Sequence, residues 1–365
     1  MRTLARVLAA LLLALAGLAS CAQSHIEAGL LLADLAAAPG QPSVLARLAP
    51  APERRQVSYG DHVGDLYTPG QGAAGALVLV PGAARTGKDD PRVVAFATAL
   101  ARARFQVLVP DLKGARALVP SAADADDVAD AVRELSGGRR KVAVAAVSYA
   151  AVPAVLAALQ PDLAEAVDPV VAIGPPYDLG AVVTFFTTGW YREQAGMPWQ
   201  HAEPNAYGKW VFVAANAGRM EDSADRALLA AIARRRMEQP DAPIDDLVRG
   251  LTPQGRAVMA LLDNRDPERA PALLAGLPAS IRSRMAELDL SRRDLAGLKA
   301  RVMVVHGRDD RIIPWTEGAA LARAAPRGRL YLLDSLAHAD LRPGGLADTA
   351  TLWRAVVDLL DTRRG

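Results

Sequence analysis

The sequence predicts an α/β fold in which a mostly parallel sheet is flanked by helices. Short apolar runs alternate with helical stretches along most of the chain, as is typical of parallel strands buried on both faces. The alternation stops over residues 178–298, which are mostly helical, and then resumes. Hydrophobic residues make up 51% of the 365 residues and charged residues 22%, a composition that argues against a disordered chain or a coiled coil.

Each apolar run between turn signals is interpreted as a strand, and each longer stretch with helical apolar spacing as a helix. The expected strands cover residues 57–59, 63–67, 76–80, 105–109, 142–147, 170–173, 301–306 and 329–333. The expected helices of the sheet domain cover residues 91–104, 123–135, 149–159, 316–325 and 348–360.

The helical block interrupts the sheet between the strand ending near Ile173 and the strand starting near Arg301. Open α/β sheets place their sites at the carboxyl ends of the strands, so we expect this block to form a cap over that edge. The predicted organisation is therefore a core of residues 56–177 and 299–365 with a helical cap of residues 178–298.

The first residues predict a secretory signal. Arg2 and Arg6 precede the uncharged stretch Val7–Leu18, which is shorter than the ~20 residues that span a bilayer. The stretch ends in Leu-Ala-Ser-Cys, which resembles a bacterial lipobox and ends at Cys21. The resemblance implies a lipoprotein signal peptide over residues 1–20 and a lipid on Cys21 that anchors the mature protein to the membrane. An ordinary signal peptide followed by a chance cysteine is the alternative.

Residues 21–55 are expected to be a tether between lipid and core, with one short helical patch at residues 26–37. Cys21 is the only cysteine, so no internal disulfide can form. An aspartate that commonly retains lipoproteins at the inner membrane is absent after Cys21, where Ala22 and Gln23 follow. The resemblance therefore favours the outer membrane, with the protein on its periplasmic face.

The formal net charge is +2, and no basic cluster typical of nucleic-acid binding is present. We therefore expect no nucleic-acid partner. Removal of residues 1–20 leaves 40 basic and 40 acidic residues, so electrostatic attraction to anionic lipid should be weak.

The expected strand at residues 142–147 leads directly into Ser148 and a helix. A serine on such a sharp turn projects its hydroxyl above the sheet, and the helix N-terminus faces developing negative charge. Small residues are needed two positions to either side, where Ala146 and Ala150 stand. By this motif alone, a chance serine at a strand end is the stronger reading.

Three further segments lie at the same expected edge. Pro81-Gly82-Ala83-Ala84 follows the strand at residues 76–80, although a Pro-Gly turn can simply end a strand. The spacing H-G-x-x-D-x-x-x-P over residues 306–314 places a carboxylate, Asp310, where it can orient an imidazole. His338 follows the next strand. A lone histidine in a loop is usually just exposed, but its placement one strand and one helix beyond the acid favours a role as general base.

In the order Ser148, Asp310, His338, these motifs resemble the α/β-hydrolase superfamily over roughly residues 55–365. The resemblance implies that Ser148 is a nucleophile, His338 a general base and Asp310 the acid that orients the base. It also implies an oxyanion hole from backbone amides of Tyr149 and of Ala83 or Ala84. This sequence departs from the family at the elbow, where alanines replace two glycines, and at Pro81, where many relatives carry histidine.

Two other carboxylates compete with Asp310 for the role of the acid. Asp310 lies four residues after His306, the position that the superfamily uses. Asp309 is expected to face solvent or to pair with a neighbouring arginine. Asp178 follows the preceding strand, a position that some members use.

The predicted activity is hydrolysis of a small-molecule carboxylic ester through an acyl-serine, with no metal or organic cofactor. A peptidase or amidase, and a catalytically silent envelope lipoprotein, remain alternatives. Residues 185–212 hold eight of the seventeen aromatic residues, which form the core of the cap, line an apolar acyl or aryl pocket, or face the membrane. Structural roles are expected for the other histidines, which are His25, His62, His201 and His306.

Overall fold

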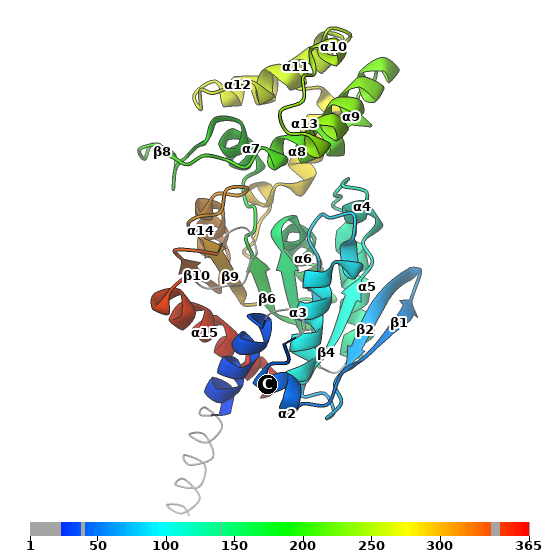
Figure 1. Cartoon of the computed structure of the whole chain (residues 1–365), viewed down its shortest axis with the longest axis vertical. Helices are drawn as coiled ribbons and strands as arrows, with labels where there is room; N and C mark the ends of the chain where they lie inside the picture. Colours follow the sequence, from blue (N-terminus) through cyan, green and yellow to red (C-terminus); the bar gives the residue numbers. More distant parts are fainter. Residues whose placement is uncertain (1–22, 38–40, 139, 337–343, 365) are drawn as a thin grey trace, which may run out of the picture.

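The computed structural model describes residues 23–37, 41–138, 140–336 and 344–364. An eight-stranded sheet forms its centre, with helices on both faces and a helical layer above one end (Figure 1). The strand order is β1-β2-β4-β3-β5-β6-β9-β10, and β2 runs antiparallel to both of its neighbours while the other pairs are parallel. The strands are β1 (Glu53–Tyr59), β2 (His62–Thr68), β3 (Gly75–Val80), β4 (Phe105–Pro110), β5 (Val142–Val147), β6 (Val167–Ile173), β9 (Val302–Gly307) and β10 (Gly328–Leu333).

The predicted mostly parallel sheet is confirmed, and its strands are apolar because both of its faces are buried. Successive side chains alternate between the faces: Val78 and Val80 pack on one side, Leu77 and Leu79 on the other. The first side is covered by α5 (Asp124–Ser136), α6 (Ala151–Ala158) and α14 (Trp315–Ala324), and the second by α3 (Pro91–Arg102), α15 (Leu346–Leu360) and helical residues 23–35. Shorter helical elements are α2 (Val44–Leu48), α4 (Lys113–Arg116), η1 (Gly87–Asp89), η2 (Ser148–Ala150), η3 (Leu290–Arg292) and η4 (Asp361–Arg364).

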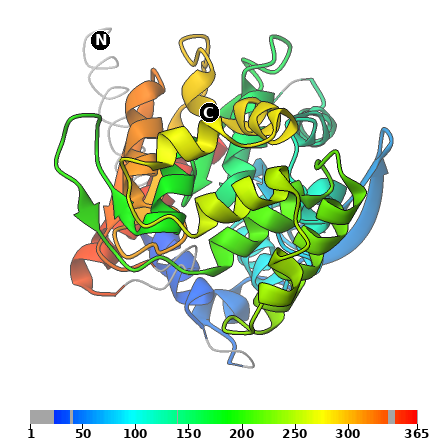
Figure 2. The same ribbon diagram turned by 90° about the horizontal axis from the view of Figure 1, so that it is seen from above.

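Residues 178–298, here called the cap, lie over the carboxyl ends of the strands (Figures 1 and 2). The cap has its own apolar core, in which Trp210, Ile232 and Leu261 are buried. The buried Asp225 carboxylate joins two of its helices by accepting bonds from the backbone of Thr252 (2.9 Å) and Gly255 (2.9 Å). The cap elements are α7 (Leu179–Thr188), β7 (Trp190–Tyr191), β8 (Gln200–His201), α8 (Tyr207–Ala217), α9 (Ser223–Glu238), α10 (Asp245–Val248), α11 (Pro253–Leu262), α12 (Ala270–Ala275) and α13 (Ala279–Leu288).

The segment expected to be a free tether is instead packed on the core. Residues 23–35 are helical, with Ala28 and Leu31 fully buried against the sheet domain. Gly29 lets this helix approach the Trp353 ring, since a Cβ there would lie 2.9 Å from it. Within the described residues, no helix is long and apolar enough to cross a bilayer.

The junction between core and cap is fixed by one buried carboxyl group. Glu317, at the start of α14, accepts hydrogen bonds from the backbone amides of Tyr177 (3.0 Å) and Asp178 (2.7 Å). Burial, with the nearby carboxylates of Asp178 and Asp289, raises the pKa of Glu317 to about 8 despite these two amide donors.

This raised pKa predicts that the protein loses stability as the pH rises. Between the ordinary value of 4.5 and about 8, folded Glu317 holds a proton that the unfolded chain releases, so the free energy of unfolding falls across that window. Glu317→Gln removes the titration and should flatten this part of the profile. Urea unfolding at pH 5 and pH 8 measures it, and an equal decline in the variant and the wild type would contradict the prediction.

Candidate active site

Ser148 lies at the carboxyl end of β5 in a left-handed backbone conformation, with φ +58°. Non-glycine residues rarely adopt this conformation, which costs about 1–3 kcal/mol and is found mainly where function requires it. β5 is held between β3 and β6, and α6 starts three residues later, so the turn has no freedom to relax. The serine therefore stands on a sharp strand-to-helix turn of the kind that presents a nucleophile.

The two alanines that replace the usual glycines are compatible with this turn. Ala146 pairs with Val80 and Ala172 in the sheet, and both Ala146 and Ala150 are fully buried. Ala150 has φ −62°, an ordinary helical value that needs no glycine. Methyl groups therefore fit at both positions while Ser148 keeps its left-handed backbone.

Asp310 lies in the loop after β9, buried and held by its own loop. Its Oδ1 accepts hydrogen bonds from the backbone amides of Ile312 (2.8 Å) and Ile313 (3.0 Å). Its Oδ2 lies 3.3 Å from Nε2 of His306, which is fully buried in β9. These contacts fix the plane of the carboxylate.

His306 helps to position the Asp310 carboxylate. This contact was not predicted from the sequence, where His306 served only to locate Asp310 within the motif. Its Nε2 also lies 3.1 Å from the carbonyl oxygen of Ile313, and a carbonyl can only accept, so Nε2 carries the proton. The absent side chain of Gly318 makes room for this ring, since a Cβ there would lie 2.4 Å from Nδ1. The spacing of four residues between His306 and Asp310 is the one feature of the sequence that could have indicated their contact.

Asp309 is half-buried and binds the loop after β10, a contact that the sequence did not predict. It accepts hydrogen bonds from the Ser335 hydroxyl (3.1 Å) and the Leu336 amide (2.8 Å), in the loop after β10. Asp348 of α15 binds the same loop through the amides of Asp334 (2.8 Å) and Ser335 (3.0 Å). Two carboxylates thus hold the segment that leads toward His338, which itself lies outside the described residues.

Asp178, the competing acid, is used as a helix cap. Its Oδ1 accepts from the Ala181 amide at 3.1 Å, at the start of α7. Its own amide donates to Glu317. Asp178 therefore caps helix α7 and helps to hold the junction between core and cap.

The loop after β3 lies directly against the serine turn. A Cβ on Gly82 would approach the carbonyl oxygen of Val147 to 3.3 Å, a closeness that glycine permits. Ala83 and Ala84 follow it and line the same cavity as Ser148 and Tyr149. The structure therefore brings the two segments expected to form the oxyanion hole together at one edge.

Tyr149 is held below this edge by a buried acid. Its hydroxyl donates to Asp124, whose carboxylate also accepts from the Ser121 amide at 2.9 Å. Burial and the Asp124 carboxylate raise the pKa of the Tyr149 phenol, which therefore stays protonated and fixed. The backbone at Tyr149, next to Ser148, is anchored by this contact.

A cavity of about 870 Å³ lies between the sheet edge and the cap, and its lining is mainly apolar. Such a volume is typical of a small-molecule site. The core contributes Ser148 and the loop after β3, and the loop of Asp310 contributes Ile312 and Ile313. The cap contributes mostly apolar side chains, among them Leu179, Val182, Val183, Val211, Met285 and Leu288.

The aromatic residues of the cap divide between the two interior roles considered for them. Phe186, Tyr207 and Phe212 line the cavity. Phe185 is fully buried against Tyr191, with ring centroids 5.6 Å apart. The short β7–β8 pair, which the sequence pattern did not indicate, carries part of this aromatic cluster.

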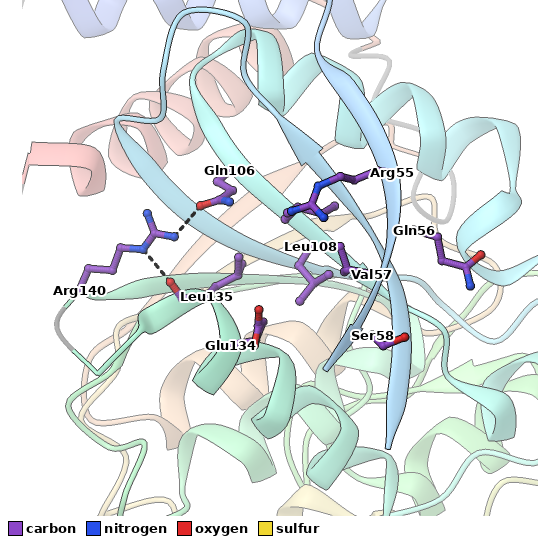
Figure 3. A pocket seen from close by; sticks show the side chains of 10 residues that line it. Arg55, Gln56, Val57, Ser58, Gln106, Leu108, Glu134, Leu135 and Arg140 are labelled. Carbon is purple, nitrogen blue, oxygen red and sulfur yellow. Dashed lines mark hydrogen bonds between the residues drawn. The ribbon is translucent and has the colours of Figure 1, made fainter. Parts of the chain in front are cut away.

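A second cavity, of about 390 Å³, lies between β1, β4 and α5 (Figure 3). Ser58 is its only described hydroxyl side chain, and no histidine is among its described lining residues. Its described lining therefore offers no imidazole to activate the hydroxyl, in contrast to the arrangement expected at Ser148.

The remaining described histidines have structural partners. His25 accepts from the Trp353 indole at 3.2 Å, and His201 stacks edge-on against Trp190. His62 lies between two carboxylates, with Nδ1 3.2 Å from Asp127 and Nε2 3.1 Å from Asp130. Among the residues that the structure describes, no group of three or more His, Cys, Asp or Glu could hold a metal ion.

Neither the protein-family models nor the curated protein sequences give a match to this chain. Solved structures with a similar arrangement include a candidate lipase from Acinetobacter baumannii AYE (TM-score 0.48, 14% identity, 86% of this chain and 93% of that chain). A meta-cleavage product hydrolase from Pseudomonas fluorescens IP01 has a TM-score of 0.44 at 15% identity, covering 84% and 97%. An alpha/beta fold family hydrolase from Bacillus anthracis str. Sterne has a TM-score of 0.43 at 12% identity, covering 85% and 99%.

The strand order, the antiparallel β2 and the left-handed serine after β5 are those of the α/β-hydrolase fold. The predicted fold class, a mostly parallel sheet flanked by helices, is confirmed by this topology.

The geometry yields a prediction for the three competing acids. Asp310→Asn should lower kcat by about two to four orders of magnitude with KM little changed, because an amide favours the wrong histidine tautomer. Asp309→Asn and Asp178→Asn should each cost roughly tenfold or less, since an amide oxygen can still accept from the loops that they hold.

Steady-state hydrolysis of a chromogenic ester by the three variants measures the difference. A collapse of kcat in Asp178→Asn together with near-normal Asp310→Asn would move the acid to the loop after β6.

Proposed function

We propose that the protein is a serine hydrolase that cleaves a carboxylic ester with an apolar acyl or aryl group. The observation that carries the proposal is the strained Ser148 turn, which opens into a large apolar cavity. The fixed carboxylate of Asp310 on the neighbouring loop supports it. The assignment of His338 as the base rests on the sequence motif.

In the proposed mechanism, His338 takes the proton of the Ser148 hydroxyl as its oxygen attacks the ester carbonyl carbon. Asp310 orients the imidazole and stabilises its charged form. The backbone amides of Tyr149 and of Ala83 or Ala84 bind the oxyanion, and losing one such donor costs about 2.7–4 kcal/mol of barrier in a well-studied protease. The alcohol leaves with the proton from His338, and water then hydrolyses the acyl-serine by the same route.

The charge of the cavity favours an ester over a peptide. Asp90 is the only acidic side chain among its described lining residues. That carboxylate already accepts from the backbone (2.9 Å) and the side chain (3.1 Å) of Arg92, and these bonds lower its pKa. An amine of a peptide substrate would therefore find no free carboxylate in this part of the lining.

Replacement of the nucleophile tests the activity. Ser148→Ala should fold normally, yet lose fluorophosphonate labelling and hydrolysis of short p-nitrophenyl esters, because both require the activated hydroxyl. Ser58→Ala, at the second cavity, is the matched control and should keep both. Labelling is read by in-gel fluorescence and hydrolysis by absorbance.

Wild-type protein that neither reacts with the fluorophosphonate nor cleaves any ester or amide in a panel would overturn the proposal. It would favour the silent envelope module. Cleavage of amides alone would instead favour the peptidase or amidase.

We also propose that Cys21 is lipidated after removal of residues 1–20 and that the protein is held on the periplasmic face of the outer membrane. The sequence of the leader supports this. Cys21→Ala should leave an uncleaved precursor or a soluble form, because the thiol that carries the lipid is gone. Metabolic labelling with a clickable fatty acid reports the modification, and an unlabelled, soluble wild-type protein would contradict it.

A further inference from the structure

We propose that the face at the amino-terminal ends of the parallel strands rests on an anionic lipid bilayer, so that the cap and the Ser148 cavity point into the water. This basal face consists of Ile26, Val44, Arg47, Leu48, Arg104 and Arg140. The proposal rests on the lipid attachment at Cys21 proposed above and names the surface that the attached lipid brings to the membrane.

The docked amino-terminal helix restricts how the domain can be oriented. Only Ala22 separates Cys21 from the described helical residues 23–35. Ser24 donates to Asp361 at 2.6 Å, and Glu27 pairs with Arg363. A lipid on Cys21 therefore cannot act through a long flexible tether, and the surface near Gln23 must come close to the bilayer.

Several contacts show which surface lies near Gln23. Arg363, the partner of Glu27, also donates to the carbonyl oxygen of Ala103, next to Arg104 at the start of β4. Pro50, just after α2, packs against Gly70, where a Cβ would lie 2.6 Å from the proline ring. In Figure 1, α2 and the carboxyl terminus lie at the end of the molecule opposite the cap.

This surface exposes large apolar side chains that the core does not use. Ile26 is 65% exposed on the amino-terminal helix, and Val44 and Leu48 are 52% and 66% exposed one turn apart on α2. Helical residues four apart share a face, so the two α2 side chains point the same way. Apolar side chains of this kind enter the boundary between lipid headgroups and acyl chains.

The same surface carries arginines without carboxylate partners among the described residues. Arg104 donates to the Gly72 carbonyl (3.4 Å), and Arg140 donates to the Leu135 carbonyl (2.7 Å) and the Gln106 amide oxygen (2.6 Å; Figure 3). Arg47 lies exposed between Val44 and Leu48. These charges remain available to phosphate groups of anionic lipids.

Two acids near this surface are already paired with arginines. Asp34 pairs with Arg102 at 2.9 Å, and Asp168 pairs with Arg301 at 3.0 Å. Three of the six residues that define the basal face are exposed arginines and none is acidic, so these six residues carry positive charge although the mature chain is expected to be neutral. Charge complementarity, together with the exposed apolar side chains, identifies an anionic bilayer as the occupant.

The orientation determines how substrate arrives. Leu35 and Ala37 line the Ser148 cavity, at the far end of the segment that starts beside Cys21. The cavity lies at the carboxyl ends of the strands, under the cap, so this orientation turns it away from the bilayer. The substrate then enters from the aqueous side, and the aromatic residues of the cap do not face the membrane.

Single-cysteine reporters in the full-length lipidated protein test this orientation. Cys21 is the only natural cysteine and is blocked by its lipid, so a polarity-sensitive fluorophore reacts only with an introduced thiol. Ile26→Cys and Leu48→Cys report the basal face. Leu346→Cys and Met197→Cys, at exposed positions 91% and 44% accessible beyond the opposite edge of the sheet, are the matched controls. All four replace exposed side chains, and circular dichroism checks their folding.

The labelled proteins are reconstituted on vesicles of phosphatidylethanolamine and phosphatidylglycerol and recovered by flotation. We expect a blue shift and quenching by lipid-borne quencher at positions 26 and 48, and neither at 346 and 197. Protein that floats with no signal at 26 and 48, or with signal at the control positions, overturns the basal face but leaves the lipid anchor intact. Protein that does not float overturns the anchor and the orientation together.

A variant that lacks the basal arginines tests how much electrostatic attraction contributes to membrane contact of the basal face. Combined Arg47→Gln, Arg104→Gln and Arg140→Gln should weaken quenching at position 48 severalfold on anionic vesicles, and added salt should do the same to the parent. Arg226→Gln, Arg234→Gln and Arg249→Gln, at exposed cap positions, form the control and should have no effect. Equal effects of the two sets, or no effect of either, would refute the role of the basal arginines.

Ester hydrolysis in detergent is independent of all these outcomes and reports the proposed activity separately.

Discussion

The rest of the site depends on one strained residue, the left-handed Ser148 after β5. A conformation that costs about 1–3 kcal/mol persists only where its surroundings over-determine it. Here β5 is bonded on both sides and α6 follows at once, so the chain cannot relax without breaking the sheet. The buried methyl groups of Ala146 and Ala150 fill the space around the turn, and Gly82 lets the neighbouring loop come within contact. Buried residues on both sides of the turn thus support the strained conformation.

Around this turn, buried or half-buried carboxyl groups fix the loops by accepting hydrogen bonds from backbone N–H groups. Asp310 holds its own loop, Asp309 and Asp348 hold the loop after β10, and Glu317 holds the start of the cap. Asp225 does the same inside the cap. A loop at a sheet edge has amides with no strand partner, and a buried carboxylate can satisfy two of them at once. The same device therefore recurs at each place where a loop has to be rigid.

The sequence was sufficient for the sheet, because its strands are short apolar runs separated by clear turn signals. It was also sufficient to locate Ser148 and Asp310 at the same sheet edge, since each directly follows a parallel strand. The sequence did not predict the hydrogen bonds of Asp309 to the loop after β10 or those of Glu317 to the start of the cap. An acidic residue in a sequence does not show which distant backbone amides it will bind. The packing of residues 23–35 was missed for a related reason: Pro-punctuated sequence after it resembled a linker.

The parallel topology gives the two edges of the sheet opposite electrostatic characters. Helices that precede parallel strands end at the amino-terminal edge, where their negative dipole ends favour arginine and lysine. Arg104 follows α3 in this way, Arg140 follows α5 and Arg327 follows α14. At the carboxyl edge, helices begin, and the start of α6 directs its positive end toward the turn that carries Ser148. The helix dipoles therefore favour negative charge at the carboxyl edge of the sheet and arginine or lysine at the amino-terminal edge. Because these charges balance, the net charge of the chain is close to zero and does not reveal the difference between the two edges.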